Sequence, residues 1–95
     1  MRKLALAVAL TFLLAGTAAA QNVKVGILMG FSGPLASLGP AIEAGALLAA
    51  DQVNQAGGIN GMDVETVSRD TATDPGVGRD AASKLVEVDR VPAIV

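Results

Sequence analysis

Apolar and polar positions after residue 20 fall into blocks that predict three strands separated by two helices. Val23–Met29 has aliphatic side chains on both faces, which is typical of a parallel strand covered on both sides. Asp63–Ser68 is a weaker strand pattern, in which Val64 and Val67 are apolar and the rest polar. That pattern favours a place nearer the edge of a sheet. A third strand is predicted to begin near Pro92.

Two amphipathic helices are predicted between these strands. The first covers Pro40–Ala56, since proline suits the first helical turn and Gly57-Gly58 can adopt the backbone that ends a helix. The second begins at Pro75, with Asp74 as its cap. The apolar positions that recur at helical spacing are Ile42, Ala46, Ala49, Ala50 and Val53 in the first helix and Val77, Ala81, Leu85 and Val88 in the second.

The order strand, helix, strand, helix, strand predicts an α/β fold. We expect a parallel sheet with flanking helices, wound right-handed as in Rossmann-like and flavodoxin-like folds. No linker or repeat interrupts residues 21–95, so they are predicted to belong to one lobe. The sequence stops at the opening of an apolar strand that begins near Pro92. We therefore expect residues 21–95 to be the N-terminal part of a longer lobe.

Residues 1–20 have the pattern of a cleaved signal peptide. Arg2 and Lys3 precede the apolar run Leu4–Leu14, and Ala18-Ala19-Ala20 supplies the small residues of a cleavage site. The alternative, an uncleaved anchor, needs about 20 apolar residues to cross a bilayer. The chain also has no cysteine to carry a lipid. We expect an exported protein that is not tethered.

Removal of the signal peptide changes the charge balance. Nine acidic residues then face five basic ones, a net charge of about −4, which argues against nucleic acid and anionic membranes as partners. The absence of histidine removes the commonest metal ligand and the usual general base near neutral pH.

The loop after the first strand, Phe31–Gly39, is the best candidate for a binding site. Ligands of open α/β sheets bind where a strand passes into a helix. The loop has neither the G-x-G-x-x-G spacing nor a P-loop lysine, so it does not predict nucleotide binding. Ser32 and Ser37 offer neutral donors near a helix N-terminus, which favours a carboxylate, and Leu35 and Leu38 add apolar surface.

That loop suits an amino acid or a short carboxylic acid. The alternative is that Ser32-Gly33-Pro34 is only a tight turn and that Leu35 packs in the core. We favour the turn for Gly33 and Pro34 and leave both interpretations open for Ser32.

The carboxylates do not predict catalysis or metal binding. Asp70 and Asp74 flank one loop, and a catalytic pair is possible in principle. A helix cap at Asp74 and solvated charges at Asp70, Asp80 and Asp89 fit the pattern better, and the calcium-binding D-x-D-x-D-G pattern is absent. We expect no enzyme activity, no metal and no cofactor.

Three segments give the chain a family resemblance. They are V-K-V-G-I-L-M-G-F-S-G-P-L-A-S-L-G (Val23–Gly39), A-D-Q-V-N-Q-A-G-G-I-N-G (Ala50–Gly61) and R-D-T-A-T-D-P (Arg69–Pro75). In order and spacing, these segments resemble the periplasmic branched-chain amino acid-binding proteins of ABC transporters. These are type I periplasmic binding proteins. The resemblance implies a two-lobed fold that closes on a ligand, and this chain would hold the start of the first lobe.

The resemblance also implies a function. The chain would be a periplasmic solute-binding component that captures an amino acid or similar small carboxylate or amide and delivers it to an inner-membrane ABC permease. At the position of Leu38, amino acid binders often have a tyrosine that lines the side-chain pocket, so leucine leaves room for a bulkier ligand. At Thr73 some members have a disulfide cysteine. The main residues that grip the ligand's carboxylate and amine would lie beyond Val95.

Two other functions remain open. The extracellular sensor of a signalling receptor would share the fold and need a transmembrane segment downstream. An α/β enzyme such as a reductase is disfavoured, because no phosphate-binding motif is present.

Overall fold

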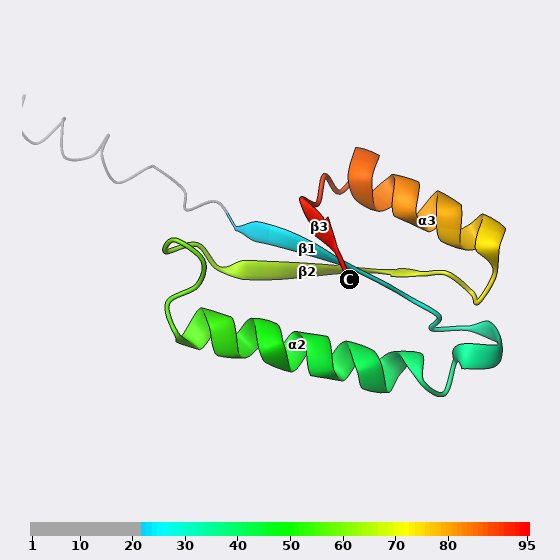
Figure 1. Ribbon diagram of the computed structural model, residues 1–95, viewed down its shortest axis with the longest axis horizontal. Helices are drawn as coiled ribbons and strands as arrows, with labels where there is room; N and C mark the ends of the chain where they lie inside the picture. Colours follow the sequence, from blue (N-terminus) through cyan, green and yellow to red (C-terminus); the bar gives the residue numbers. More distant parts are fainter. Residues whose placement is uncertain (1–21) are drawn as a thin grey trace, which may run out of the picture.

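A parallel sheet with the strand order β2-β1-β3 forms the centre of the fold (Figure 1). The computed structural model describes residues 22–95, so the predicted signal peptide lies outside the described residues and its cleavage stays a prediction. The central strand β1, Val23–Met29, pairs along its whole length with β2, Val64–Asp70. On its other side β1 pairs with the two-residue strand β3, Ala93–Ile94. The predicted α/β fold with a parallel sheet is confirmed.

The two helices cover opposite faces of this sheet (Figure 1). The first, α2, covers Gly39–Gln55, and the second, α3, covers Pro75–Glu87. A short 3-10 helix, η1, occupies Gly33–Leu35 between β1 and α2, where the sequence predicted a tight turn. Both helices follow the carboxyl end of a strand, so the loops that lead into them lie at the same edge of the sheet.

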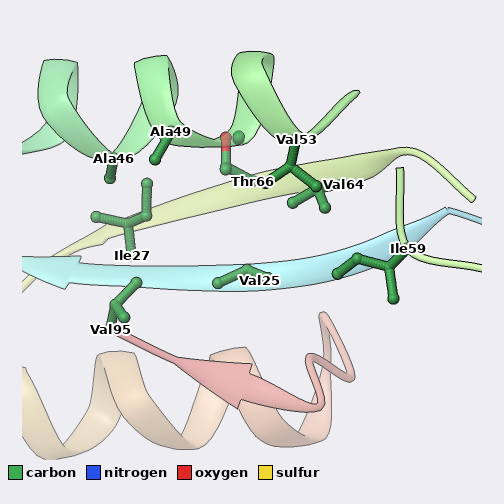
Figure 2. A pocket seen from close by; sticks show the side chains of 10 residues that line it. Val25, Ile27, Ala46, Ala49, Val53, Ile59, Val64, Thr66 and Val95 are labelled. Carbon is green, nitrogen blue, oxygen red and sulfur yellow. The ribbon is translucent and has the colours of Figure 1, made fainter. Parts of the chain in front are cut away.

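Of the four buried apolar residues among residues 22–95, Ile27 faces α2 (Figure 2) and the other three lie on the α3 side of the sheet. Leu85 is fully buried, and Ala81 and Val91 are buried around it. Gly26 makes this packing possible, because a Cβ there would lie 3.1 Å from the Leu85 methyl groups and 3.2 Å from Val91. A side chain at 26 would therefore require the Leu85 and Val91 side chains to shift.

The apolar residues predicted to pack on the sheet do face it in the middle of the helices, but those at the helix ends are exposed. Ala46 and Ala49 of α2 face the sheet as expected (Figure 2). In contrast, Ile42 is 50% exposed, and Val77 and Val88 at the two ends of α3 are also exposed. The described sheet is only three strands wide, which limits the apolar surface available to cover either helix.

The second strand is longer than its sequence pattern predicted. Polar residues after Ser68 favoured a loop, but pairing with β1 continues to Met29 opposite Asp70. Arg69 and Asp70 are therefore strand residues, because the ladder with a neighbouring strand outweighs weak local β-propensity. This extension carries Asp70 to the edge of the sheet where the loops lie.

Two polar contacts of β2, one with α2 and one with the segment after α3, were not predicted. The Asn54 side chain of α2 donates to the Val64 carbonyl at 3.0 Å and accepts from the Val64 N–H at 2.7 Å, which fixes the start of β2. Arg69 makes a two-bond ion pair with Asp89, at 2.9 and 3.1 Å. The expectation that Asp89 is only a solvated charge is wrong, and its hydrogen bond from Arg69 lowers the pKa of that carboxyl.

Candidate functional site

Within residues 22–95, one cavity borders the sheet on the α2 side and another lies beside α3, where it reaches Asp70 at the carboxyl edge. The larger, of about 350 Å³, lies between α2 and the sheet. Figure 2 shows its aliphatic lining, in which Thr66 is the one polar side chain. A second cavity, of about 260 Å³, lies beside α3 and is lined by Arg69, Asp70, Asp80 and Lys84, among others. The larger cavity has almost no polar lining to orient a ligand. The second combines the apolar side chains of Val77 and Ala81 with four charged ones.

The loop after β1 and the loop after β2 meet at the carboxyl edge of the sheet (Figure 1). Their contact is built by hydrogen bonds between residues 38 to 41 positions apart in the sequence. We call residues 30–38 the first loop and residues 71–74 the second loop. Because this edge is where open α/β sheets bind ligands, the pair of loops is the candidate site.

Asp70 is the residue that ties the two loops together. Its Oδ1 accepts hydrogen bonds from the backbone N–H groups of Phe31 at 2.8 Å, Ser32 at 3.3 Å and Ala72 at 2.8 Å. Its Oδ2 accepts from the Ser32 hydroxyl at 2.6 Å. A carboxylate carries no hydrogen at neutral pH, so the hydroxyl must be the donor in that short bond. The expectation that Asp70 is only a solvated charge is wrong.

Thr73 makes the second connection between the loops. Its hydroxyl donates to the Ser32 carbonyl at 3.0 Å and accepts from the Leu35 N–H at 3.3 Å. Close approach of the backbones requires glycine at 33, where φ is +76° and a Cβ would lie 2.5 Å from the Ala72 carbonyl oxygen. Thr73 therefore connects the two loops by hydrogen bonds. At this position the family resemblance implies a disulfide cysteine in some members.

The three predicted site residues all lie on the first loop, and they differ in what they can offer a ligand. Leu38 is 55% exposed. Ser37 is also exposed, next to the start of α2. Ser32 is exposed but already donates its hydroxyl proton to Asp70, so its oxygen is left with acceptor capacity only. The predicted role of Ser32 as a hydrogen-bond donor is therefore not available in this arrangement.

The cap prediction for α3 is confirmed and shows how the second loop ends. Asp74 Oδ1 accepts from the Val77 N–H at 2.9 Å, and Pro75 occupies the first turn. By contrast, α2 has no side-chain cap, and the residue before its first turn is Leu38. The start of α2 is positioned instead by Gly39, which is buried against the carbonyl of Gly30.

The hydrogen bonds to Asp70 predict a pH dependence of stability. The Ser32 hydroxyl and, after it, the Ala72 N–H lower the pKa of the Asp70 carboxyl below its usual value. The folded state therefore binds fewer protons than the unfolded state near that value. The stabilising contribution is complete above the usual aspartate pKa and is lost as the pH falls through it towards the lowered pKa.

We expect Asp70→Asn to flatten this acid-induced loss of stability. The measurement is urea unfolding, followed by circular dichroism, at a series of pH values between about 5 and 2. Asp63→Asn, at the opposite end of β2, is the matched control because it removes a carboxylate that is far from both loops. Equal pH dependence in the wild type and Asp70→Asn would contradict the role assigned to Asp70.

Comparison with known proteins identifies the lobe that carries these loops. The sequence profile described as "Periplasmic binding protein" matches residues 22–95, that is, all the described residues. The chain belongs to the periplasmic binding protein family. It is a type I member, and its structural neighbours are two-lobed type I periplasmic binding proteins.

Two relatives of this binding protein have names that state a role. A leucine-, isoleucine-, valine-, threonine- and alanine-binding protein from Pseudomonas aeruginosa is 41% identical over 68 residues, which is 72% of this chain and 18% of the relative. A chemotactic signal transduction system substrate-binding protein, BasB, from Halobacterium salinarum is 41% identical over 79 residues, which is 81% of this chain and 19% of the relative.

A solved structure has the same arrangement of strands and helices. The branched-chain amino acid transporter substrate-binding protein LivJ from Streptococcus pneumoniae, in complex with isoleucine, superposes with a TM-score of 0.74 at 35% identity. The match covers 78% of this chain and 21% of LivJ. The chain thus spans about a fifth of the length of the relatives it matches.

Sequence analysis missed Asp70, the residue that organises the site. One local signal could have found it. In an Asx turn, an aspartate side chain accepts a hydrogen bond from the backbone N–H two residues later, as Asp70 does from Ala72. The bonds to Phe31 and Ser32 had no local signal, since they join residues about 38 positions apart.

Among residues 22–95, no helix has both the length and the apolar character needed to cross a bilayer. The same residues hold no cluster of three or more potential metal-ligating side chains.

Proposed function

We propose that the protein is the solute-binding component of an ABC importer, exported to the periplasm, where it captures an amino acid or a similar small carboxylate or amide. The observation that carries the proposal is the pair of loops fixed to each other at the carboxyl edge of a periplasmic binding-protein sheet. Closure of two lobes on the ligand would be the signal that the inner-membrane permease reads.

Leu38, Ser37 and Ser32 are the proposed ligand contacts of this lobe. Leu38 is an exposed aliphatic side chain directly before α2. The loop that carries it is held at Phe31 and Ser32 by Asp70 and at Ser32 and Leu35 by Thr73. A wall held in place before the ligand arrives loses little conformational freedom on binding, which favours affinity. An aliphatic wall with a few hydroxyl groups suits an amino acid with an apolar side chain.

Leu38→Tyr in the full-length protein tests the site. The tyrosine ring would fill space that leucine leaves open, so we expect affinity for phenylalanine to fall about tenfold relative to alanine. Calorimetric titration with both amino acids measures the ratio. Leu48→Tyr is the matched control, because Leu48 is 57% exposed further along α2. An unchanged ratio in Leu38→Tyr would place Leu38 outside the site.

A sensory role is the second candidate function. The observation that favours it is the name of the Halobacterium relative, which places that protein in chemotactic signal transduction. A sensor and an importer component can share this lobe, so the partner decides between them. Co-purification with a membrane permease favours import, and co-purification with a transducer favours sensing.

A further inference from the structure

One edge of the sheet formed by residues 22–95 is the outer side of β2, where no further strand pairs with it. The Val23 N–H donates to the Asp63 carbonyl. At the other end of the strand, the Thr71 N–H donates to the Met29 carbonyl. Since alternate residues of a parallel strand bond the same neighbour, the backbone groups of the even-numbered residues of β2 point away from β1. This edge therefore presents donors and acceptors to a further strand.

The two ends of this edge are already occupied. The Asn54 side chain takes both outward-facing groups of Val64, the N–H at 2.7 Å and the carbonyl at 3.0 Å. At the other end, the Asp70 side chain is held by the first loop. The backbone groups between these ends are the part of the edge that a further strand can bond. Such a strand would lie opposite residues 65–69.

The charges along this part of β2 are self-complementary. Glu65, Val67 and Arg69 lie on one face of β2, since side chains alternate along a strand, and Arg69 lines the cavity beside α3. A second β2 that runs antiparallel and overlaps fully has Val67 opposite Val67 and Glu65 opposite Arg69. Opposite charges in directly opposed pairs stabilise a sheet, whereas like charges there destabilise it. A parallel β2 in the same register would place Glu65 opposite Glu65.

We propose that a second copy of this protein pairs with this edge, β2 against β2, about a twofold axis at Val67. The backbones of Thr66 and Ser68 in one copy exchange hydrogen bonds with Ser68 and Thr66 of the other, because these residues are opposed in that register and face outward in both copies. The two sheets become one continuous sheet. Because the shared ladder is short, the dimer is weak and depends on concentration.

The neighbouring charges are compatible with this pairing. Lys24 lies beside Glu65 in the ladder of β1 and β2, so Glu65 would lie between Lys24 of its own copy and Arg69 of the other. Arg69 donates two hydrogen bonds to Asp89, and a guanidinium has further N–H groups for a second carboxylate. Lys84 lines the same cavity as Arg69 and adds positive charge there. Charges of opposite sign therefore alternate across the joined sheet.

A single cysteine tests the register of the dimer, because residues 1–95 contain none. In full-length Val67→Cys the two thiols would face each other across the axis, where opposed Cα atoms are about 4.5 Å apart and a disulfide can form. Glu65→Cys is the matched control on the same face of the same strand, since its two thiols would be about 13 Å apart along the strand. We expect air-oxidised Val67→Cys to run mainly as a dimer on non-reducing electrophoresis. Glu65→Cys should run as the wild type does.

Sedimentation velocity of the full-length protein measures the association itself. We expect the dimer fraction of the wild type to rise between about 10 µM and 1 mM. Glu65→Arg opposes two arginines at each end of the ladder, so its dissociation constant should be at least about tenfold higher. Glu43→Arg makes the same change of net charge on α2 and should match the wild type. Circular dichroism shows that each variant is folded.

Three outcomes would overturn the proposal, and none depends on which ligand the protein binds. The first is a wild type that stays monomeric at every concentration. The second is a dimer whose dissociation constant Glu65→Arg leaves unchanged. The third is cross-linking of Glu65→Cys that equals or exceeds that of Val67→Cys, which would place the second copy in another register or on another surface.

Discussion

Leu85→Ala is expected to lower the free energy of unfolding by about 3 kcal/mol. Leu85 is 0% exposed and lies between the backbone of β1 at Gly26 and the Val91 side chain. Truncation would remove contacts on the α3 side of the sheet and leave a cavity that a β-strand backbone and a helix cannot easily close. Urea unfolding followed by far-ultraviolet circular dichroism measures the change, which suits a chain without tryptophan or tyrosine.

Val86→Ala provides the matched control for Leu85. Val86 is adjacent on α3 but 56% exposed, so its truncation should change stability by about 0.5 kcal/mol or less. If the two variants lose the same stability, Leu85 is not the centre of the packing between α3 and the sheet.

Gly39→Ala is expected to cost about 3 kcal/mol and to displace the first loop. A Cβ at this buried position would overlap the carbonyl oxygen of Gly30 and come within 3.2 Å of the Phe31 ring. Since both obstacles belong to the end of β1 and the loop after it, relief requires α2 to shift away. Helix propensity alone predicts the opposite sign, because alanine is a better helix former than glycine. We expect the steric clash to dominate.

Gly45→Ala is the control that isolates the clash. Gly45 lies within the same helix, and apart from its chain neighbours and the helix's own backbone no atom lies within 4 Å of the position that a Cβ would take. This substitution should therefore stabilise the protein by up to about 1 kcal/mol. A loss of stability in Gly39→Ala and a gain in Gly45→Ala, measured by the same unfolding experiment, would support the contact between Gly39 and Gly30. Stabilisation by Gly39→Ala would contradict it.

The elements that the sequence predicted well are those set by local signals. Val23–Met29 was predicted with its observed ends, because a run of aliphatic residues between polar neighbours identifies a buried strand. The start of α3 followed from Asp74 and Pro75, since capping joins residues only three positions apart. The predicted helix over Pro40–Ala56 differs from α2 by one residue at each end.

The site was predicted only in part. Sequence analysis located the first loop and named Ser32, Ser37 and Leu38 as ligand contacts, and those contacts stay a prediction. It assigned a donor role to Ser32 that the bond to Asp70 removes. It also treated Asp70 and Asp89 as solvated, because nothing near them in the sequence shows the partners that they find in the fold.

The sequence by itself determined which segments are strands and helices, their parallel arrangement and the edge of the sheet where a ligand site would lie. These properties follow from apolar periodicity, caps and turn residues, which act over a few positions of the chain. The tertiary structure alone decided that β2 extends to Asp70 and that Asp70 accepts four hydrogen bonds, three of them from the first loop. That outcome depends on the register between β1 and β2, which brings residues about 38 positions apart into contact.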